Sequence, residues 1–268
     1  MILTARATAD TLRAMFDPGP PPAFAAHFAK VPDHEKVKHH FWHGWGPIFY
    51  RGPLDGSARV LCVASDPGPT ERIAGRNLVG DAGQKVQGFL AKIGLTRSYL
   101  CLNAFVYALY PSHSSYAWGM LKDPEFLAWR NELYDLARGP DVVAVVGFGQ
   151  IAQRAVDLWD GKDGLEVFEV PHPSSHDDAK LRSEWRKAVT KLRKIVDPDP
   201  DGSPRDWNYG DEWRSRDWKP VPARDLPFGV PAWIGDAEWC RESTPSYRNC
   251  VYRHPDDPMS LVWTAPGD

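Results

Sequence analysis

The sequence predicts an α/β fold with three layers, α/β/α, around a central, mostly parallel four-stranded sheet. Apolar runs with the length of strands alternate with segments of helical pattern between residues 58 and 196, which is the order that builds a parallel sheet. The run 60–64 is apolar throughout, as expected for a strand covered on both faces. Helix signals separate these runs, such as Asp123-Pro124, an N-cap followed by a proline at the first helical position.

The same patterns place the elements in order. We expect strands near 59–64, 99–105, 141–147 and 165–170, and helices near 84–93, 124–137, 150–159 and 179–196. The flanks differ in kind. Residues 1–57 read as an irregular N-terminal extension packed on the 58–196 domain, and 197–268 as an irregular C-terminal strap. The strap holds six of the twelve tryptophans, which argues for burial against the core instead of disorder.

Composition excludes several classes. The chain has 268 residues, is 43% hydrophobic and 25% charged, and contains no apolar run of membrane-spanning length and no signal-peptide pattern. Four scattered cysteines do not make a disulfide framework. We therefore expect a cytoplasmic monomer. A net charge of −3 does not indicate a generally basic nucleic-acid binder.

The most informative stretch follows the first strand. Asp66 ends the apolar run, and Pro67-Gly68-Pro69 stops it abruptly. A carboxylate at the carboxyl end of a buried strand lies where open α/β sheets bind their ligands. Glycines at 75, 80 and 83 continue the loop, and such residues let a backbone pass close to a ligand.

Residues 64–83 resemble the first signature of the uracil-DNA glycosylase superfamily, and most of all its thermophilic-type branch, which usually carries an iron–sulfur cluster. The match runs without a gap through Pro67-Gly68, Glu71, Gly75, Val79-Gly80 and Ala82-Gly83. Two further signatures follow in family order at expected strand ends, Asn103 and His172-Pro173-Ser174. The resemblance covers roughly residues 58–195.

This resemblance implies a monofunctional glycosylase that hydrolyses the N-glycosidic bond of a flipped uracil nucleotide in DNA and so starts base excision repair. It implies that Asp66 stabilises the sugar cation and orients water, and that His172 donates a hydrogen bond to the leaving base. Asn103 would read the uracil edge, with Gly68 and Leu78 beside the base. Contacts to DNA phosphates would come from Gly83, Gln84, Ser174 and Ser175.

The chain departs from the family pattern at four positions. The cluster-bearing branch usually has Glu where Ser65 stands and Ala where Asp66 stands, whereas an Asp in this second slot resembles the uracil-specific branch. The uracil-specific branch has a bulky Tyr where Gly68 stands, and the cluster-bearing branch has a Phe that stacks on the base where Leu78 stands. We expect a roomier pocket that also accepts other deaminated or modified bases. Other rings would then stack on the base or close the pocket, and the candidates are Phe105, Tyr107 and Tyr116.

No cofactor is expected. An iron–sulfur cluster needs four thiolates, but Cys62 and Cys101 fall inside expected strands, where they read as core residues. The sequence also lacks the Cys-x-x-Cys pair that is typical of a zinc site. The closely spaced His39, His40 and His43 are a weak candidate for a metal site, because they lie among many aromatic residues.

Two other functions stay open at this point. Gly147-Phe148-Gly149 with Ala152, followed by Glu169, forms a dinucleotide fingerprint between a strand and a helix, which is typical of an oxidoreductase. A module that binds damaged DNA without cleaving it fits the same signatures. A covalent capture of DNA through His113, which lies in the loop after Asn103, is a further variant, although the basic loop of such relatives is missing.

Overall fold

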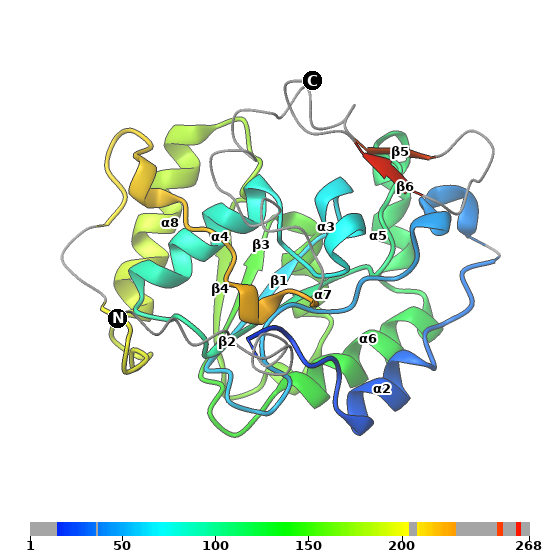
Figure 1. Ribbon diagram of the computed structural model, residues 1–268, viewed down its shortest axis with the longest axis horizontal. Helices are drawn as coiled ribbons and strands as arrows, with labels where there is room; N and C mark the ends of the chain where they lie inside the picture. Colours follow the sequence, from blue (N-terminus) through cyan, green and yellow to red (C-terminus); the bar gives the residue numbers. More distant parts are fainter. Residues whose placement is uncertain (1–14, 36, 204–207, 229–250, 254–260, 264–268) are drawn as a thin grey trace, which may run out of the picture.

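The computed structural model describes residues 15–35, 37–203, 208–228, 251–253 and 261–263 (Figure 1). Its strands are β1 Val60–Ala64, β2 Tyr99–Asn103, β3 Ala144–Phe148, β4 Glu166–Val170, β5 Val251–Arg253 and β6 Leu261–Trp263. Its α-helices are α2 Pro22–Phe28, α3 Pro69–Ala74, α4 Asp81–Lys92, α5 Ala117–Met120, α6 Pro124–Ala137, α7 Gln150–Asp157 and α8 Asp178–Leu192.

The central sheet has the strand order β2-β1-β3-β4, and all its pairings are parallel. Helices α4 and α8 cover one face, and α2, α6 and α7 cover the other (Figure 1). Every residue of β1, β2 and β3 is buried because both faces are covered, which is why these strands read as unbroken apolar runs. The predicted three-layer α/β/α fold is confirmed.

The observed elements differ from the sequence prediction mainly at short helices. α2 lies in the extension that was expected to be irregular, and α3 in the loop after β1. Both have six or seven residues and a proline in the first turn, so neither is long enough to show a helical period. The Asp123 cap is confirmed, since its carboxylate accepts from the backbone N–H groups of Glu125 and Phe126.

The strand order places a topological switch at β1. The chain adds β2 on one side of β1 and then returns to add β3 on the other side. The loops that leave the carboxyl ends of β1 and β3 therefore diverge to opposite faces, and such a crevice is where open α/β sheets bind ligands.

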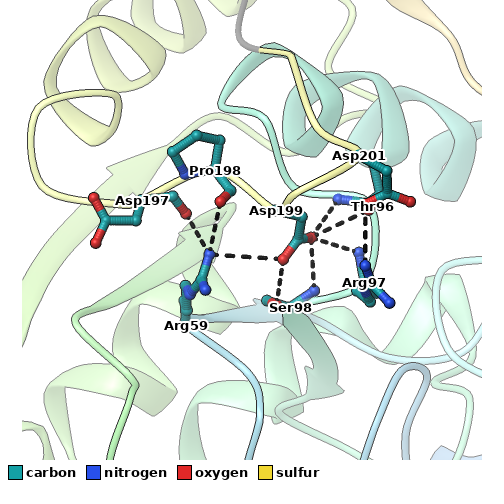
Figure 2. A network of polar contacts seen from close by, with 8 residues as sticks. All are labelled: Arg59, Thr96, Arg97, Ser98, Asp197, Pro198, Asp199 and Asp201. Carbon is teal, nitrogen blue, oxygen red and sulfur yellow. Dashed lines mark hydrogen bonds and ion pairs between the residues drawn. The ribbon is translucent and has the colours of Figure 1, made fainter.

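A buried carboxylate ties the chain after α8 to the loop before β2. Asp199 Oδ2 accepts from the N–H groups of Thr96, Arg97 and Ser98 at 2.7, 2.8 and 3.1 Å, and its Oδ1 accepts from the Ser98 hydroxyl (Figure 2). Arg59 adds hydrogen bonds to the carbonyls of residues 197 and 198. Burial would raise the pKa of Asp199, but these donors hold it lower, at about 2.

Asp199→Asn should therefore destabilise the fold. A carboxylate whose pKa falls from 3.8 to about 2 on folding contributes about 2 kcal/mol, fully present above pH 4 and lost as the pH falls toward 2. In urea unfolding at pH 7, the free energy of unfolding of the variant should be lower than that of the wild type by about 2 kcal/mol or more. This difference should become smaller below pH 4, in measurements down to pH 3.5. The matched control is Asp201→Asn, because Asp201 is half-exposed and contacts the same Thr96. Equal losses in the two variants would contradict this assignment.

Residues 208–228 cross the layer formed by α4 and α8. They bring two buried carboxylates to buried cations of the core. Asp217 lies 2.6 Å from Lys92 Nζ, and Asp225 lies 2.9 Å from Arg51 Nη1, with all four side chains at most 1% exposed. The remaining part of the predicted strap includes 229–250, which lies outside the described residues.

Candidate active site

A pocket of about 540 Å³ opens at the carboxyl ends of the sheet strands. Asp66 enters it from the loop after β1, Leu109 from the loop after β2, and His172 and Ser174 from the loop after β4. Gly68 and Leu78 also line it, as do residues of the first turn of α4. The volume is in the range of small-molecule sites. Five of the predicted site residues, Asp66, Gly68, Leu78, His172 and Ser174, thus meet in one cavity.

The Asp66 carboxylate is half-buried in the pocket wall. Its Oδ2 accepts from the backbone N–H of Leu109 at 2.9 Å, which fixes its orientation. Burial raises the pKa of Asp66 to about 6, against the lowering effect of the Leu109 N–H, and the nearby Glu71 carboxylate adds to the rise. At neutral pH the group is an anion that its surroundings do not fully stabilise. Such an anion is suited to stabilise a cation that forms in the pocket.

Glu71 braces the loops that carry the pocket wall, a role that the sequence did not reveal. Its Oε1 accepts from the N–H groups of Val79 and Gly80 at 2.7 and 3.0 Å, and its Oε2 accepts from Gly68 at 3.0 Å. One buried carboxylate thereby joins the start of α3 to the segment that enters α4. Of these three contacts, only the one to Gly68 could have been predicted from the sequence, because Gly68 and Glu71 have the spacing of a capping box.

His172 is held as a neutral imidazole. The backbone N–H of Ser174 donates to His172 Nδ1 at 3.1 Å, which leaves the ring proton on Nε2. Burial, with a smaller contribution from the positive charge of Lys85, lowers the pKa of His172 to about 4. The ring can therefore donate one hydrogen bond from Nε2 at neutral pH without carrying charge.

Leu78 has an unusual backbone, with φ of +53°, the one positive value among the non-glycine residues in the described ranges. A left-handed backbone at a leucine is strained, and such strain gathers at functional sites. The turn also explains Gly83, because a Cβ at Gly83 would lie 1.6 Å from the Leu78 carbonyl oxygen. Gly83 is the residue that allows α4 to approach the pocket segment this closely.

The four residues predicted to contact DNA phosphates differ in how accessible they are. Gly83 and Gln84 are buried, and the Gln84 carbonyl accepts from the N–H of Lys219 in the chain segment that crosses α4. Their burial argues against a direct contact with DNA. Ser174 is exposed and lines the pocket, while Ser175 lies next to it, with its N–H bonded to the His172 carbonyl. These two serines keep the predicted role as a proposal.

Asn103 does not line the pocket, although it ends β2 as predicted. It is 2% exposed, and its Nδ2 donates to Asn77 Oδ1 at 2.9 Å. Its own Oδ1 is buried and has no hydrogen-bond partner among the described residues. An orphaned acceptor of this kind is costly unless a donor reaches it at some stage. A base would reach it only after a shift of the side chains in between.

The rings that the sequence suggested as partners for the base lie elsewhere. Phe105 and Tyr107 are 5% and 7% exposed, in a hydrophobic cluster that does not line the pocket. Tyr116 is exposed, packs against the tilted ring of His40 and is not part of the lining. A different ring, that of Trp42, lines the pocket from the N-terminal extension.

A family model for the uracil DNA glycosylase superfamily matches residues 51–193, more than half of the chain. The chain belongs to the uracil DNA glycosylase superfamily. A comparison with curated proteins gives no match. Superfamily membership implies a DNA glycosylase, a hydrolase of DNA repair. The matched range begins at Arg51 and includes β1 to β4, the pocket loops and α8.

In this member of the superfamily, the dinucleotide-like turn has a packing explanation. Gly149 has φ of +88°, and a Cβ there would lie 2.9 Å from the Cβ of His172. A Cβ at Gly147 would lie 3.1 Å from the Cα of Gln153 in α7. The Gly149 N–H and the Gln153 side chain both donate to the Val170 carbonyl. The two glycines thus let the end of β3 and the start of α7 position the loop that carries His172.

The described cysteines are core residues, as predicted. Cys62 and Cys101 are buried free thiols that face each other in the register of β1 and β2. Cys240 and Cys250 lie outside the described residues. Within the described ranges, no cluster of three His, Cys, Asp or Glu is placed to hold a metal ion. None of the helices described there has the length and apolar character needed to cross a bilayer.

Proposed function

We propose that this glycosylase excises uracil from DNA by hydrolysing the bond between C1′ of a flipped nucleotide and N1 of the base. The observation that carries the proposal is the pairing of Asp66, an anion with a raised pKa, with the neutral His172 in one pocket. The superfamily match supports the reaction class. Uracil-containing DNA is the proposed partner, and the active form is proposed to be a cytoplasmic monomer.

The chemistry divides between the two sides of the breaking bond. As the bond opens, its electron pair leaves with the base and collects on N1 and O2, and the sugar becomes an oxocarbenium-like cation. The Asp66 anion stabilises the cation, orients the water whose oxygen forms the new bond to C1′, and takes up the proton that this water releases. The Nε2–H of His172 donates to O2 of the leaving anion. A neutral donor is suited to this step because it stabilises charge without having to lose a proton.

Base selection is proposed to rest on Asn103. Its amide nitrogen is engaged by Asn77, and the unpartnered Oδ1 remains to accept from a base. Uracil N3–H is a donor, whereas N3 of cytosine is an acceptor, so cytosine would leave this oxygen unpaired at a cost of about 1–3 kcal/mol. Gly68 and Leu78 form no bulky wall, and a hydrophobic pocket rejects one added methyl group by only about 1–3 kcal/mol.

The test uses the purified full chain and oligonucleotides, single- and double-stranded, that carry one uracil, hypoxanthine, xanthine, hydroxymethyluracil or mismatched thymine. Alkali then converts abasic sites into strand breaks. We expect scission at uracil and at one or more of the other bases. No scission at any base, with tight binding of the uracil oligonucleotide, would instead indicate a module that binds damage without cleaving it. Scission at uracil alone would mean that another residue closes the pocket.

A further inference from the structure

Trp42 is the one Phe, Tyr or Trp side chain among the described residues that line the pocket. Trp42 is 40% exposed, so part of this large apolar side chain is accessible to a ligand in the pocket. It comes from the segment before residue 51, so it lies outside the range that matches the superfamily. None of the roles assigned above uses it.

The position of Trp42 is fixed by the loop after β2. Its backbone N–H donates to the carbonyl of Ala108 at 2.8 Å, and the adjacent Phe41 forms an isolated antiparallel bridge with Leu109. The indole lies against the ring of Tyr110, with centroids 4.4 Å apart and planes tilted by 45°. Three consecutive residues of one loop therefore hold the indole at the pocket.

The same loop also holds the carboxylate. The Leu109 N–H donates to Asp66, while the carbonyl of the preceding residue, Ala108, accepts from Trp42. The Trp42 backbone and the Asp66 carboxylate are thus anchored by the two ends of one peptide group, that between Ala108 and Leu109, so a single rigid unit sets their relative position. A shift of one would be passed to the other, as expected of two groups that act on one ligand.

We propose that Trp42 stacks on the target base in the pocket, which names the base-binding residue of the proposed function and rests on it. A base held away from its neighbours in DNA loses its stacking, and an aromatic side chain restores part of it. Leu78 offers no π-face, and Phe105 and Tyr107 are buried elsewhere. Because every base has a π-face, an aromatic ring that stacks on the base adds affinity without strong selection among bases.

Binding measurements separate stacking on the base from other contacts of Trp42 with DNA. Fluorescence anisotropy would compare two labelled oligonucleotides that the protein does not cleave. One carries 2′-fluoro-2′-deoxyuridine and the other a tetrahydrofuran abasic site, which lacks the base. The variants are Trp42→Leu, which removes the ring, and Trp42→Phe, which keeps a smaller one. Trp118→Leu is the matched control, because Trp118 is 43% exposed on α5 and does not line the pocket.

Trp42→Leu should bind the fluorouridine oligonucleotide about 10- to 100-fold more weakly than the wild type, and the abasic oligonucleotide within about threefold. Trp42→Phe should recover most of the loss, and Trp118→Leu should show none. Equal losses on both oligonucleotides, or no loss on either, would overturn the proposal. Circular dichroism melting of each variant checks that the fold is kept.

The proposed reaction and the proposed role of Trp42 can be tested separately. If the wild type leaves an ordinary uracil oligonucleotide intact after alkali, the reaction assigned above is wrong whatever Trp42 does. If the wild type cleaves that oligonucleotide and Trp42→Leu binds and cleaves it equally well, the reaction stands and only the role of Trp42 is wrong.

Discussion

The Asp66→Asn variant should excise uracil at least about 100-fold more slowly than the wild type, because one electrostatic group at a transition state contributes on that scale. The substitution keeps the size of the side chain and an oxygen for the Leu109 N–H. DNA binding should therefore change little. Single-turnover excision, with binding to an abasic oligonucleotide as the control, measures the two effects separately. Full activity in this variant would remove Asp66 from the mechanism.

The same variant should be more stable than the wild type at neutral pH. The pKa of Asp66 is higher in the folded chain, about 6, than the usual 3.8, so the ionised form destabilises the fold above pH 6. The shift sets an upper limit of about 3 kcal/mol, and partial contact with water reduces this to about 1–2 kcal/mol. The gain should disappear as the pH falls from 6 to 4. A variant less stable than the wild type at pH 7.5 would contradict the raised pKa.

Truncation after residue 197 should abolish stable folding. It removes Asp217 and Asp225, the carboxylates that pair with Lys92 and Arg51 in the core of the intact chain. Breaking one buried ion pair costs about 3–5 kcal/mol, and a domain is stable by only about 5–15 kcal/mol. The truncation also removes Asp199. Circular dichroism and urea unfolding of the fragment check this, and a soluble fragment with an unchanged melting temperature would refute it.

Point variants of the full chain measure the contribution of the ion pair between Lys92 and Asp217 on its own. Lys92→Met alone leaves the buried Asp217 carboxylate without its cation, so it should cost about 3–5 kcal/mol. Lys92→Met with Asp217→Asn removes both charges and keeps an acceptor for the Arg214 N–H. The double variant should be clearly more stable than the single one. If it is not, the destabilisation comes from lost packing and not from an unpaired charge.

Strand ends were the predictable part of the site. Asp66 follows the buried strand β1 and His172 follows the partly exposed edge strand β4, and in a parallel sheet the carboxyl ends of the strands meet at one edge. This is why two residues more than 100 positions apart could be expected in one pocket. The role of Gly83, in the first turn of α4, could not be predicted in the same way. Gly83 was expected to face a phosphate, but it serves the close approach of α4 to Leu78.

The contacts that sequence reasoning missed have no local period. Glu71 contacts Val79 and Gly80, eight and nine residues away, and Trp42 reaches the pocket from an irregular segment. A pattern of spacing reports which face of an element is buried, not which loops meet. Likewise, that Asn103 is bonded to Asn77 depends on how the strand end and the loop pack together, which no motif encodes.

The pH dependence of excision tests the central claim most directly, because Asp66 must be ionised and His172 neutral. The measurement is the second-order rate constant of uracil excision between pH 5 and pH 8.5, which reports ionisations of the free enzyme. With the pKa of Asp66 near 6 and that of His172 near 4, the rate should rise through about pH 6 and then stay level. A rate that falls as the pH rises through 6 to 7 would show that a protonated group is required and would contradict the account.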